Sequence, residues 1–187
     1  PDGGIMWDCT PLITEAAIKA INARGGVKAI AISHPHFYAT MVEWSRALGG
    51  VPIYLHEDNR DWVMRPDDCI EFWRGESKEI ADGVTLVRTG GHFPGSTVLH
   101  WAQGAGGKGV LMTGDSIMVV PDTRWVSFMY SFPNLIPLNA RAVEHIVKSV
   151  RAYQFDRIYA GWWDRVLFHD AKAAVQRSAE RYIAAIR

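Results

Sequence analysis

The sequence lacks the features that mark several large classes of protein. No stretch of 18 or more residues is continuously apolar, so we expect no membrane span. The 187 residues include two cysteines, Cys9 and Cys69, which are too few for a disulfide framework and predict a reducing, cytoplasmic setting. There is no excess charge, because 20 Lys and Arg balance 20 Asp and Glu. A nucleic-acid surface built on positive charge is therefore not expected.

What the chain does have is a globular composition rich in aromatic and turn-forming residues. Hydrophobic residues make up 48% and charged residues 21%, which predicts a single domain, 1–187, with a sizeable core. Eight tryptophans and nine prolines are present. The opening Pro1-Asp2-Gly3-Gly4 has the composition of a turn that leads into a strand. We therefore expect strands ahead of it to be missing or supplied elsewhere.

Strand and helix signals alternate in the first third of the chain and predict a βαβ arrangement. The expected elements are strand 5–9, a helix capped by Thr10 with Pro11 at its first position and ended by Gly25-Gly26, strand 27–33, helix 40–48, strand 51–55 and a short helix through Trp62. Strand 27–33 is mostly apolar, which is typical of a strand buried on both faces.

The remainder of the chain has shorter apolar runs and more frequent turn residues. From Cys69 to Met118, short apolar runs separated by Gly, Asp and Ser turns predict antiparallel strands, among them Ile70–Phe72. Residues 121–138 are predicted to be an aromatic, proline-rich loop. Helix 139–153, strand 157–160 and an amphipathic helix 170–186 are expected to follow. A mixed sheet with helices outside it accommodates this order.

Polar side chains follow several of the predicted strands. His34 and His36 come directly after a buried strand, where α/β folds place their ligands. His92 lies in a loop rich in Gly and Pro, and Asp115 follows a short apolar run. Three neutral imidazoles around one divalent cation leave a fourth position for water. The carboxylate of Asp115 is then either a fourth ligand or an acceptor for that water.

The order of these residues resembles the metallo-β-lactamase superfamily. In that family an Asp closes an early strand, and His-x-His-x-Asp-His, a loop His, a later Asp and a final His follow along the chain. Asp8 matches the first Asp, and the four candidate ligands match the His pair, the loop His and the later Asp. The resemblance runs from Ile5 to Trp162. It implies an α/β fold, the αββα four-layer sandwich, with metals at the rim between the two sheets.

The chain departs from the family pattern at two places. Tyr38-Ala39 stand where the family has Asp-His, and Gly161-Trp162-Trp163 stand where it has its last His. The absent residues are the family's second-metal ligands. The resemblance therefore implies a site for one divalent ion, with zinc expected and iron or manganese as alternatives.

The reaction expected at such a site is hydrolysis of a small ester, lactone or amide by metal-activated water. Asp115 is the candidate base, Tyr38 is a candidate hydrogen-bond donor to the oxyanion, and Asp8 is expected to orient a ligand or fix a loop.

The loop from Trp125 to Phe132, together with Trp162-Trp163, is a candidate contact surface for an aromatic or apolar acyl substrate. Packing in the core and a homodimer contact are alternatives for these aromatic residues.

Other interpretations stay open at this point. Two His with Asp115 also form the facial triad of non-haem iron oxygenases, and some members of the superfamily are iron dioxygenases. A decayed member would keep the same residues without metal, as a binding protein on a borrowed fold. A packing role explains Tyr38 equally well.

His169 is expected to begin a helix or to face solvent, or else to be a replacement ligand. Structural or surface roles are predicted for the other histidines, His56, His100 and His145.

Overall fold

The computed structural model describes residues 3–187, which form two compact units. The first unit ends at Arg74, and the second is Gly75–Arg187. Each unit has its own sheet and its own apolar core. The single domain expected from the sequence stays a prediction. The turn expected at residues 1–4 lies partly outside the described residues.

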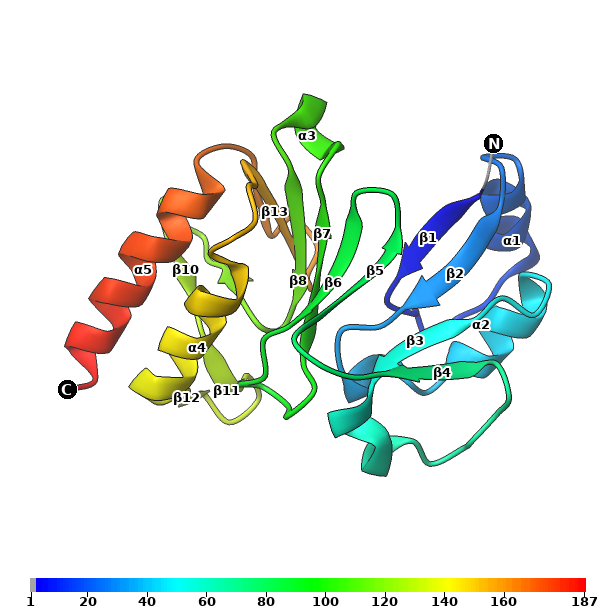
Figure 1. Cartoon of the computed structure of the whole chain (residues 1–187), viewed down its shortest axis with the longest axis horizontal. Coiled ribbons are helices and arrows are strands. Elements are labelled where there is room, and N and C mark those ends of the chain that lie inside the picture. Colours follow the sequence, from blue (N-terminus) through cyan, green and yellow to red (C-terminus); the bar gives the residue numbers. More distant parts are fainter. Residues whose placement is uncertain (1–2) are drawn as a thin grey trace. The chain divides into compact units, whose positions relative to one another are not determined.

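The first unit is built on a parallel sheet with the strand order β1-β2-β3-β4 (Figure 1). The strands are β1 (Gly4–Trp7), β2 (Val27–Ala31), β3 (Ile53–His56) and β4 (Ile70–Trp73). Between them lie α1 (Glu15–Asn22), the 3-10 turn η1 (Pro35–Phe37), α2 (Met41–Ala47) and the 3-10 turn η2 (Glu57–Trp62). The predicted βαβ arrangement is confirmed. Because the strands are parallel, the residues that follow them gather at one edge of the sheet.

Strand β4 corrects one prediction. The antiparallel strand expected at Ile70–Phe72 is wrong, because β4 pairs in parallel with β3 as the last strand of the first sheet. The connection through η2 is long enough for a parallel crossover, which a tight hairpin is not. A run of four residues carries no periodicity from which its partner or direction can be predicted.

The start of the first helix corrects a second prediction. Thr14, not Thr10, is the N-cap of α1, and its side chain accepts a hydrogen bond from Ala17 N at 3.1 Å. The carbonyl of Thr10 instead accepts hydrogen bonds from Trp44 Nε1 and Thr40 Oγ1, both at 2.9 Å. These bonds tie the segment ahead of α1 to the α2 region, so Thr10 links elements and does not begin a helix.

The core of the first unit fixes the strands that precede the candidate ligands. Ile30, Ile53 and Leu55 of the two central strands are fully buried. Trp44 of α2 joins them in one cluster, and Ile18 of α1 packs against its edge. Burial of side chains this large contributes about 1.5–3 kcal/mol each. The ends of β2 and β3 are therefore fixed by core packing.

The second unit is built on a six-stranded mixed sheet with the order β14-β13-β8-β7-β6-β5. The strands are β5 (Ser77–Ala81), β6 (Val84–Arg88), β7 (Thr97–Trp101), β8 (Val110–Gly114), β13 (Arg157–Ala160) and β14 (Val166–Leu167), with a short turn α3 (Gly104–Gly107) between β7 and β8. Strands β5 to β8 are antiparallel as predicted. Strand β13 is parallel to β8 and antiparallel to β14.

Two helices, α4 (Ala140–Val150) and α5 (Ala171–Ala185), pack on one face of this sheet (Figure 1). Val98, Leu111 and Ile158 of three neighbouring strands are buried with Ile146 of α4 and Val175 of α5. Both helices agree with the sequence prediction within a few residues. Among residues 3–187, no helix combines the length and the apolar character that crossing a membrane requires.

The aromatic segment 121–138 is more ordered than the predicted loop. It contributes β10 (Val126–Ser127), which pairs with β9 (Met118–Val119), and a hairpin of β11 (Met129–Ser131) and β12 (Ile136–Pro137). Phe128 is fully buried in the core, and the Trp125 ring lies under the Arg181 guanidinium. Strands of two or three residues depend on such tertiary contacts, and the prolines around them obscure the alternation.

Candidate functional site

Asp8 follows β1 and binds the residue that precedes the first candidate ligand. Its backbone has a φ of 58°, and its N–H donates to Ala31 O at 3.0 Å. Its Oδ1 accepts from Ser33 N at 2.7 Å, and its Oδ2 accepts from Ser33 Oγ at 3.0 Å. Asp8 therefore fixes the chain just beyond β2, which is the loop-fixing role expected from the sequence.

Ser33 connects Asp8 to His34 through its side-chain hydroxyl. Ser33 Oγ lies 2.8 Å from His34 Nδ1. Because the single hydroxyl proton is donated to Asp8, Nδ1 must carry a proton and donate it to Ser33 Oγ. The neutral ring then has its lone pair on Nε2, which is what a metal ligand must offer. The hydrogen-bond network thus sets the tautomer of this buried imidazole.

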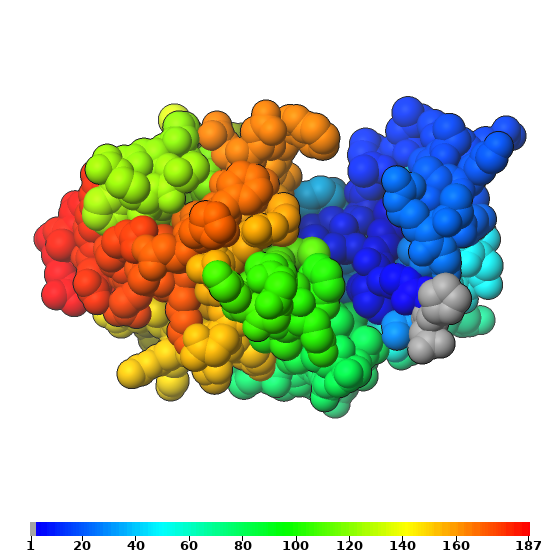
Figure 2. All heavy atoms as spheres, turned by 90° about the horizontal axis from the view of Figure 1, so that it is seen from above, coloured from blue at the N-terminus to red at the C-terminus, as the bar shows by residue number. Residues whose placement is uncertain are grey.

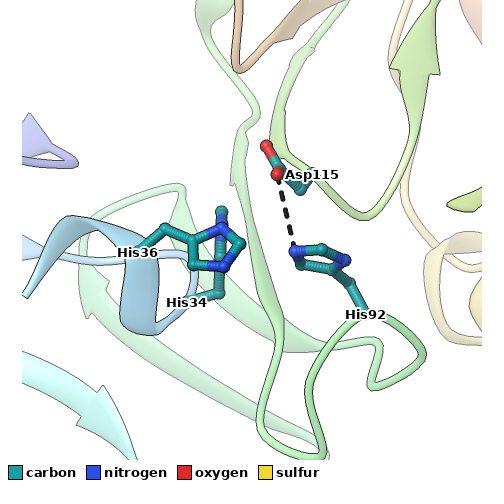
Figure 3. Close-up of side chains that lie close together, drawn as sticks. All are labelled: His34, His36, His92 and Asp115. Atoms are coloured by element: carbon teal, nitrogen blue, oxygen red, sulfur yellow. Dashed lines mark hydrogen bonds and ion pairs between the residues drawn. The ribbon is translucent and has the colours of Figure 1, made fainter. Parts of the chain in front are cut away.

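His34 and His36 form a pair of nitrogen donors within the first unit (Figure 3). Nε2 of His34 lies 3.1 Å from Nδ1 of His36, and the ring centroids are 4.8 Å apart. The turn η1 creates this approach, because Phe37 N donates to His34 O at 3.2 Å and bends the chain directly after the strand. His34 is buried, whereas His36 is exposed.

In the second unit, a hydrogen-bonded loop between β6 and β7 carries His92. The N–H and the hydroxyl of Thr89 both donate to Ser96 O, at 2.8 and 3.1 Å, and close the loop. At Gly91, where φ is 81°, a Cβ would lie 3.0 Å from Ile146 Cδ1. The backbone angle favours glycine there, and a Cβ would also crowd the end of the Ile146 side chain. These contacts constrain the backbone of the loop that carries His92.

A tight turn after β8 positions Asp115. Thr113 Oγ1 donates to Ile117 O at 2.7 Å, and Ser116 N donates to Thr113 O at 3.0 Å. Ser116 Oγ also lies 2.9 Å from Thr89 Oγ1. This hydroxyl contact links the turn to the loop that carries the candidate histidine.

His92 and Asp115 form the second pair of donors (Figure 3). Nε2 of His92 lies 3.5 Å from Oδ2 of Asp115, and the two side chains are 3% and 11% exposed. The ring of Phe93 packs edge-on against the imidazole at a centroid distance of 5.0 Å. The structure thus brings the two predicted ligands of this unit together in a mostly buried setting.

The spacing within each pair suits two ligands of one metal ion. Two atoms bound at about 2.0–2.1 Å in a tetrahedral site lie about 3.3 Å apart. The distances of 3.1 Å in the first unit and 3.5 Å in the second lie on either side of this value. Imidazole nitrogen and carboxylate oxygen are also the donor types that zinc, iron and manganese accept.

Gly161 follows β13, in the region where the family has its last His, and lies against Asp115. A Cβ at this position would be 2.9 Å from Asp115 Oδ1 and 3.3 Å from two backbone atoms of Gly114. The absence of a side chain therefore leaves room for the carboxylate. The sequence showed the missing His but not this packing, because the partner is distant along the chain.

Replacing Gly161 by alanine is expected to displace the Asp115 carboxylate from His92 and to destabilise the protein by about 1–3 kcal/mol through overpacking. The imidazole signals of His92 in NMR spectra report the displacement, and chemical denaturation reports the stability. Gly4→Ala is the matched control, because its Cβ would meet Gly26 O at an ordinary 3.6 Å. Unchanged His92 signals in Gly161→Ala would contradict the packing role.

Tyr38 packs in the apolar core of the first unit and is 8% exposed. It also lines a cavity of about 250 Å³ with neighbours that include Ala39 and Met64. Burial raises the pKa of the Tyr38 phenol, a hydrogen bond with Asn59 partly offsets the rise, and the negative charge of Asp8 adds to it. The phenol therefore keeps its proton at neutral pH. Its catalytic role stays a prediction.

Other histidines make structural contacts. His56 is buried and accepts a backbone hydrogen bond within η2, and His100 Nε2 lies 2.7 Å from Gln154 O. His169 precedes α5, is 78% exposed, and has its Nδ1 3.5 Å from Asp156 Oδ2. These contacts agree with the structural and surface roles expected from the sequence.

One curated relative matches nearly the whole chain. The uncharacterized protein YmaE of Bacillus subtilis (strain 168) is 50% identical over 182 residues, which cover 97% of this chain. The chain spans 66% of the length of YmaE. No protein-family model matches the chain.

Solved structures of metallo-β-lactamases have a similar fold. The metallo-β-lactamase DIM-1 has a TM-score of 0.69 at 14% identity, covering 97% of this chain and 83% of that one. A B3 metallo-β-lactamase with an active-site glutamic acid has a TM-score of 0.66 at 16% identity, covering 100% and 80%. A metallo-β-lactamase from Staphylococcus aureus has a TM-score of 0.64 at 16% identity, covering 98% and 59%. These likenesses confirm the α/β fold that the resemblance predicted.

Proposed function

We propose that this chain, which has the metallo-β-lactamase fold, is a metal-dependent hydrolase of a small ester, lactone or amide. The observation that carries the proposal is the spacing of the two donor pairs. His34 and His36 offer nitrogens 3.1 Å apart, and His92 offers a nitrogen 3.5 Å from an oxygen of Asp115. The three imidazoles supply the protein donors of a tetrahedral catalytic site, in which water takes the fourth position. The carboxylate of Asp115 beside His92 is then a further ligand or the acceptor for that water.

We propose further that these four residues hold one divalent ion, with zinc as the expected metal and iron or manganese as alternatives. Where the family has its further ligands, this chain has Tyr38-Ala39 and Gly161-Trp162-Trp163. None of these offers an imidazole or a carboxylate. A Cβ at Gly161 would lie 2.9 Å from Asp115 Oδ1, so a larger side chain there would have to displace the carboxylate. Both observations support a mononuclear site.

A bound divalent ion supplies hydroxide at neutral pH, because it lowers the pKa of water to about 7. Asp115 is the proposed proton acceptor. Tyr38 is the proposed donor to the oxyanion, because its phenol carries a proton at neutral pH. A preorganised donor of this kind stabilises a transition state by roughly 3–4 kcal/mol. Asp8 and Ser33 keep Nε2 of His34 unprotonated.

The substrate is proposed to be a small molecule in the cytoplasm. The balance of 20 positive and 20 negative side chains gives no support to binding of nucleic acid. Cys9 and Cys69 are free thiols, which is consistent with a reducing compartment.

Removal of the metal is the direct test. The purified protein is expected to contain about one equivalent of divalent metal and to hydrolyse 4-nitrophenyl acetate. Dialysis against EDTA is expected to reduce turnover to the uncatalysed rate, and added zinc to restore it. Elemental analysis and the release of nitrophenolate measure the two quantities on the same sample.

The outcomes separate the alternatives. Iron together with oxygen consumption would favour a dioxygenase, since two imidazoles and a carboxylate also suit non-haem iron. A folded protein that takes up no divalent metal at all would favour a binding protein. Turnover that is unaffected by complete metal removal would contradict the hydrolase mechanism.

A further inference from the structure

An aromatic surface lies directly beside His92 in the second unit. The Phe132 ring centroid is 5.8 Å from the imidazole and 4.5 Å from the ring of Trp162. Trp162 is 36% exposed, and Trp163 beside it is 92% exposed. Figure 2 shows this segment after β13, in orange, at the molecular surface. A candidate metal ligand and a partly exposed aromatic pair are therefore in contact.

Both rings are carried on short turns that the sheet and hairpin hold in place. Phe132 follows β11, and its carbonyl accepts from Leu135 N at 3.2 Å to close the hairpin turn. Trp162 follows β13, and its carbonyl accepts from Arg165 N at 3.2 Å. Gly161 N, next to it, donates to Gly114 O of β8 at 3.1 Å. The pair is thus a preformed surface.

Of the aromatic residues that the sequence predicted to contact the substrate, the structure favours only some. Phe128 is fully buried in the core, and Trp125 is covered by Arg181, whereas Phe132 lies beside His92. Phe132 and Trp162 meet edge-to-face at an interplanar angle of 64°. Aromatic rings favour such tilted contacts at centroid distances of 4.5–7 Å, and their remaining faces and edges accept a further ring in the same way.

We infer that Phe132 and Trp162 form the subsite for an aryl group on the acyl side of the substrate. This inference rests on the proposed function, because it assumes that the carbonyl carbon is attacked at an ion bound to His92. The separation of 5.8 Å between Phe132 and His92 places a ring that stacks on the pair only a few bonds from that carbon. A phenylacetyl group, with one methylene between ring and carbonyl, has this geometry.

The first test compares two esters that share a leaving group. Kinetics with 4-nitrophenyl phenylacetate and 4-nitrophenyl acetate give the ratio of their kcat/KM values. Phe132→Leu and Trp162→Leu keep the surface apolar but remove a ring, and each is expected to lower this ratio by about threefold to tenfold. Tyr130→Leu on the same hairpin is the control, because Tyr130 is exposed and its loss is expected to leave the ratio unchanged.

The second test does not depend on catalysis. Binding of 4-fluorobenzyl alcohol, followed by fluorine NMR with EDTA present, is expected to shift and broaden the fluorine signal with the native protein and the Tyr130 variant. The effect is expected to be at least several-fold weaker with either ring variant. Equal binding by all four proteins, or an unchanged ester ratio in both ring variants, would overturn the aryl subsite.

The combination of tests separates this inference from the proposed function. Ester hydrolysis without any change in selectivity would retain the hydrolase and reject the subsite. Fluorine signals that respond to the ring variants in a protein that hydrolyses neither ester would reject the hydrolase and retain an aryl-binding surface. A dimer that dissociates in Phe132→Leu and Trp162→Leu, measured by sedimentation, would show a subunit contact and reject the subsite.

Discussion

His92→Ala is expected to lose its bound metal and to hydrolyse esters slower than the native protein by roughly a hundredfold or more. The variant lacks one imidazole donor and loses the contact of His92 Nε2 with Asp115 Oδ2 at 3.5 Å. Changes to residues that only orient a ligand already weaken metal binding about 10–100-fold, so loss of a ligand is expected to cost at least as much. The imidazole is 3% exposed, and no other His lies in this loop to replace it.

His169→Ala is the matched control for this experiment. His169 is exposed and lies near Asp156, and it is expected to keep the metal and the turnover of the native protein. The control also tests whether this residue replaces the family's missing last His. Metal content after dialysis, affinity by competition with a chelator, and nitrophenolate release are measured for both variants. Circular dichroism checks whether both variants are folded.

Two results would contradict the assignment of ligands. Native metal content and turnover in a folded His92→Ala would exclude this imidazole from the site and, with it, the hydrolase as proposed. Loss of metal in His169→Ala would mean that the donor set contains a residue other than the four proposed. Retention of metal without turnover in His92→Ala would instead indicate that the remaining three donors bind the ion but do not support the reaction.

The candidate ligands could be predicted from the sequence because they follow strong strand signals. The apolar run that forms β2 predicts a buried strand, and His34 lies three residues beyond the end of β2. Asp115 also follows a strand, β8. The order of these residues along the chain, matched to a known family pattern, then predicts the fold as well. Short motifs at strand ends are thus a signal that one sequence can carry.

The direction of β4 and the start of α1 could not be predicted because local signals were ambiguous or misleading. Thr10-Pro11 is a good helix start by composition, but the Thr10 carbonyl is held by Trp44 and Thr40, far along the chain. Strand β4 is short, and its parallel pairing with β3, which the long η2 connection permits, is a tertiary contact that its composition does not indicate. In both cases a tertiary contact overrides a local preference.

The roles of the residues that support the ligands could not be predicted from the sequence either. In the sequence Ser33 is a small polar residue at the end of a strand. Only its hydrogen bonds to Asp8 and His34 show that it supports a candidate ligand. Gly161 belongs to the segment Gly161-Trp162-Trp163 that stands where the family has its last His, and only its distance to Asp115 shows why glycine fits. These functions depend on pairs of residues that the fold brings together, and a single sequence does not encode the pairing explicitly.

Asp8→Asn is expected to switch the tautomer of His34 and to weaken metal binding by about 10–100-fold. Asparagine tolerates the positive φ of 58° at this position, and its carbonyl still accepts from Ser33 N. Its amide nitrogen, however, is a donor and faces Ser33 Oγ where the carboxylate accepted a proton. The hydroxyl is therefore free to turn and donate to His34 Nδ1, which is 2.8 Å away.

The ring then carries its proton on Nε2 and has no lone pair there for a metal. Nitrogen-15 NMR of the imidazoles, recorded with EDTA present, reads the tautomer directly. We expect His34 to be protonated at Nδ1 in the native protein and at Nε2 in Asp8→Asn. Asp68→Asn is the matched control, because it removes one exposed carboxylate from the same unit. It is expected to change neither the tautomer nor the affinity.

Ser33→Ala separates the tautomer from the charge of Asp8. This variant keeps the carboxylate but removes the hydroxyl between it and His34. If the hydroxyl relay sets the ligand, Ser33→Ala loses the preference for a proton on Nδ1 and binds zinc more weakly than the native protein. If the charge alone matters, Ser33→Ala binds zinc normally and only Asp8→Asn is impaired. A native tautomer together with native affinity in both variants would show that the Asp8–Ser33–His34 chain serves the fold and not the metal.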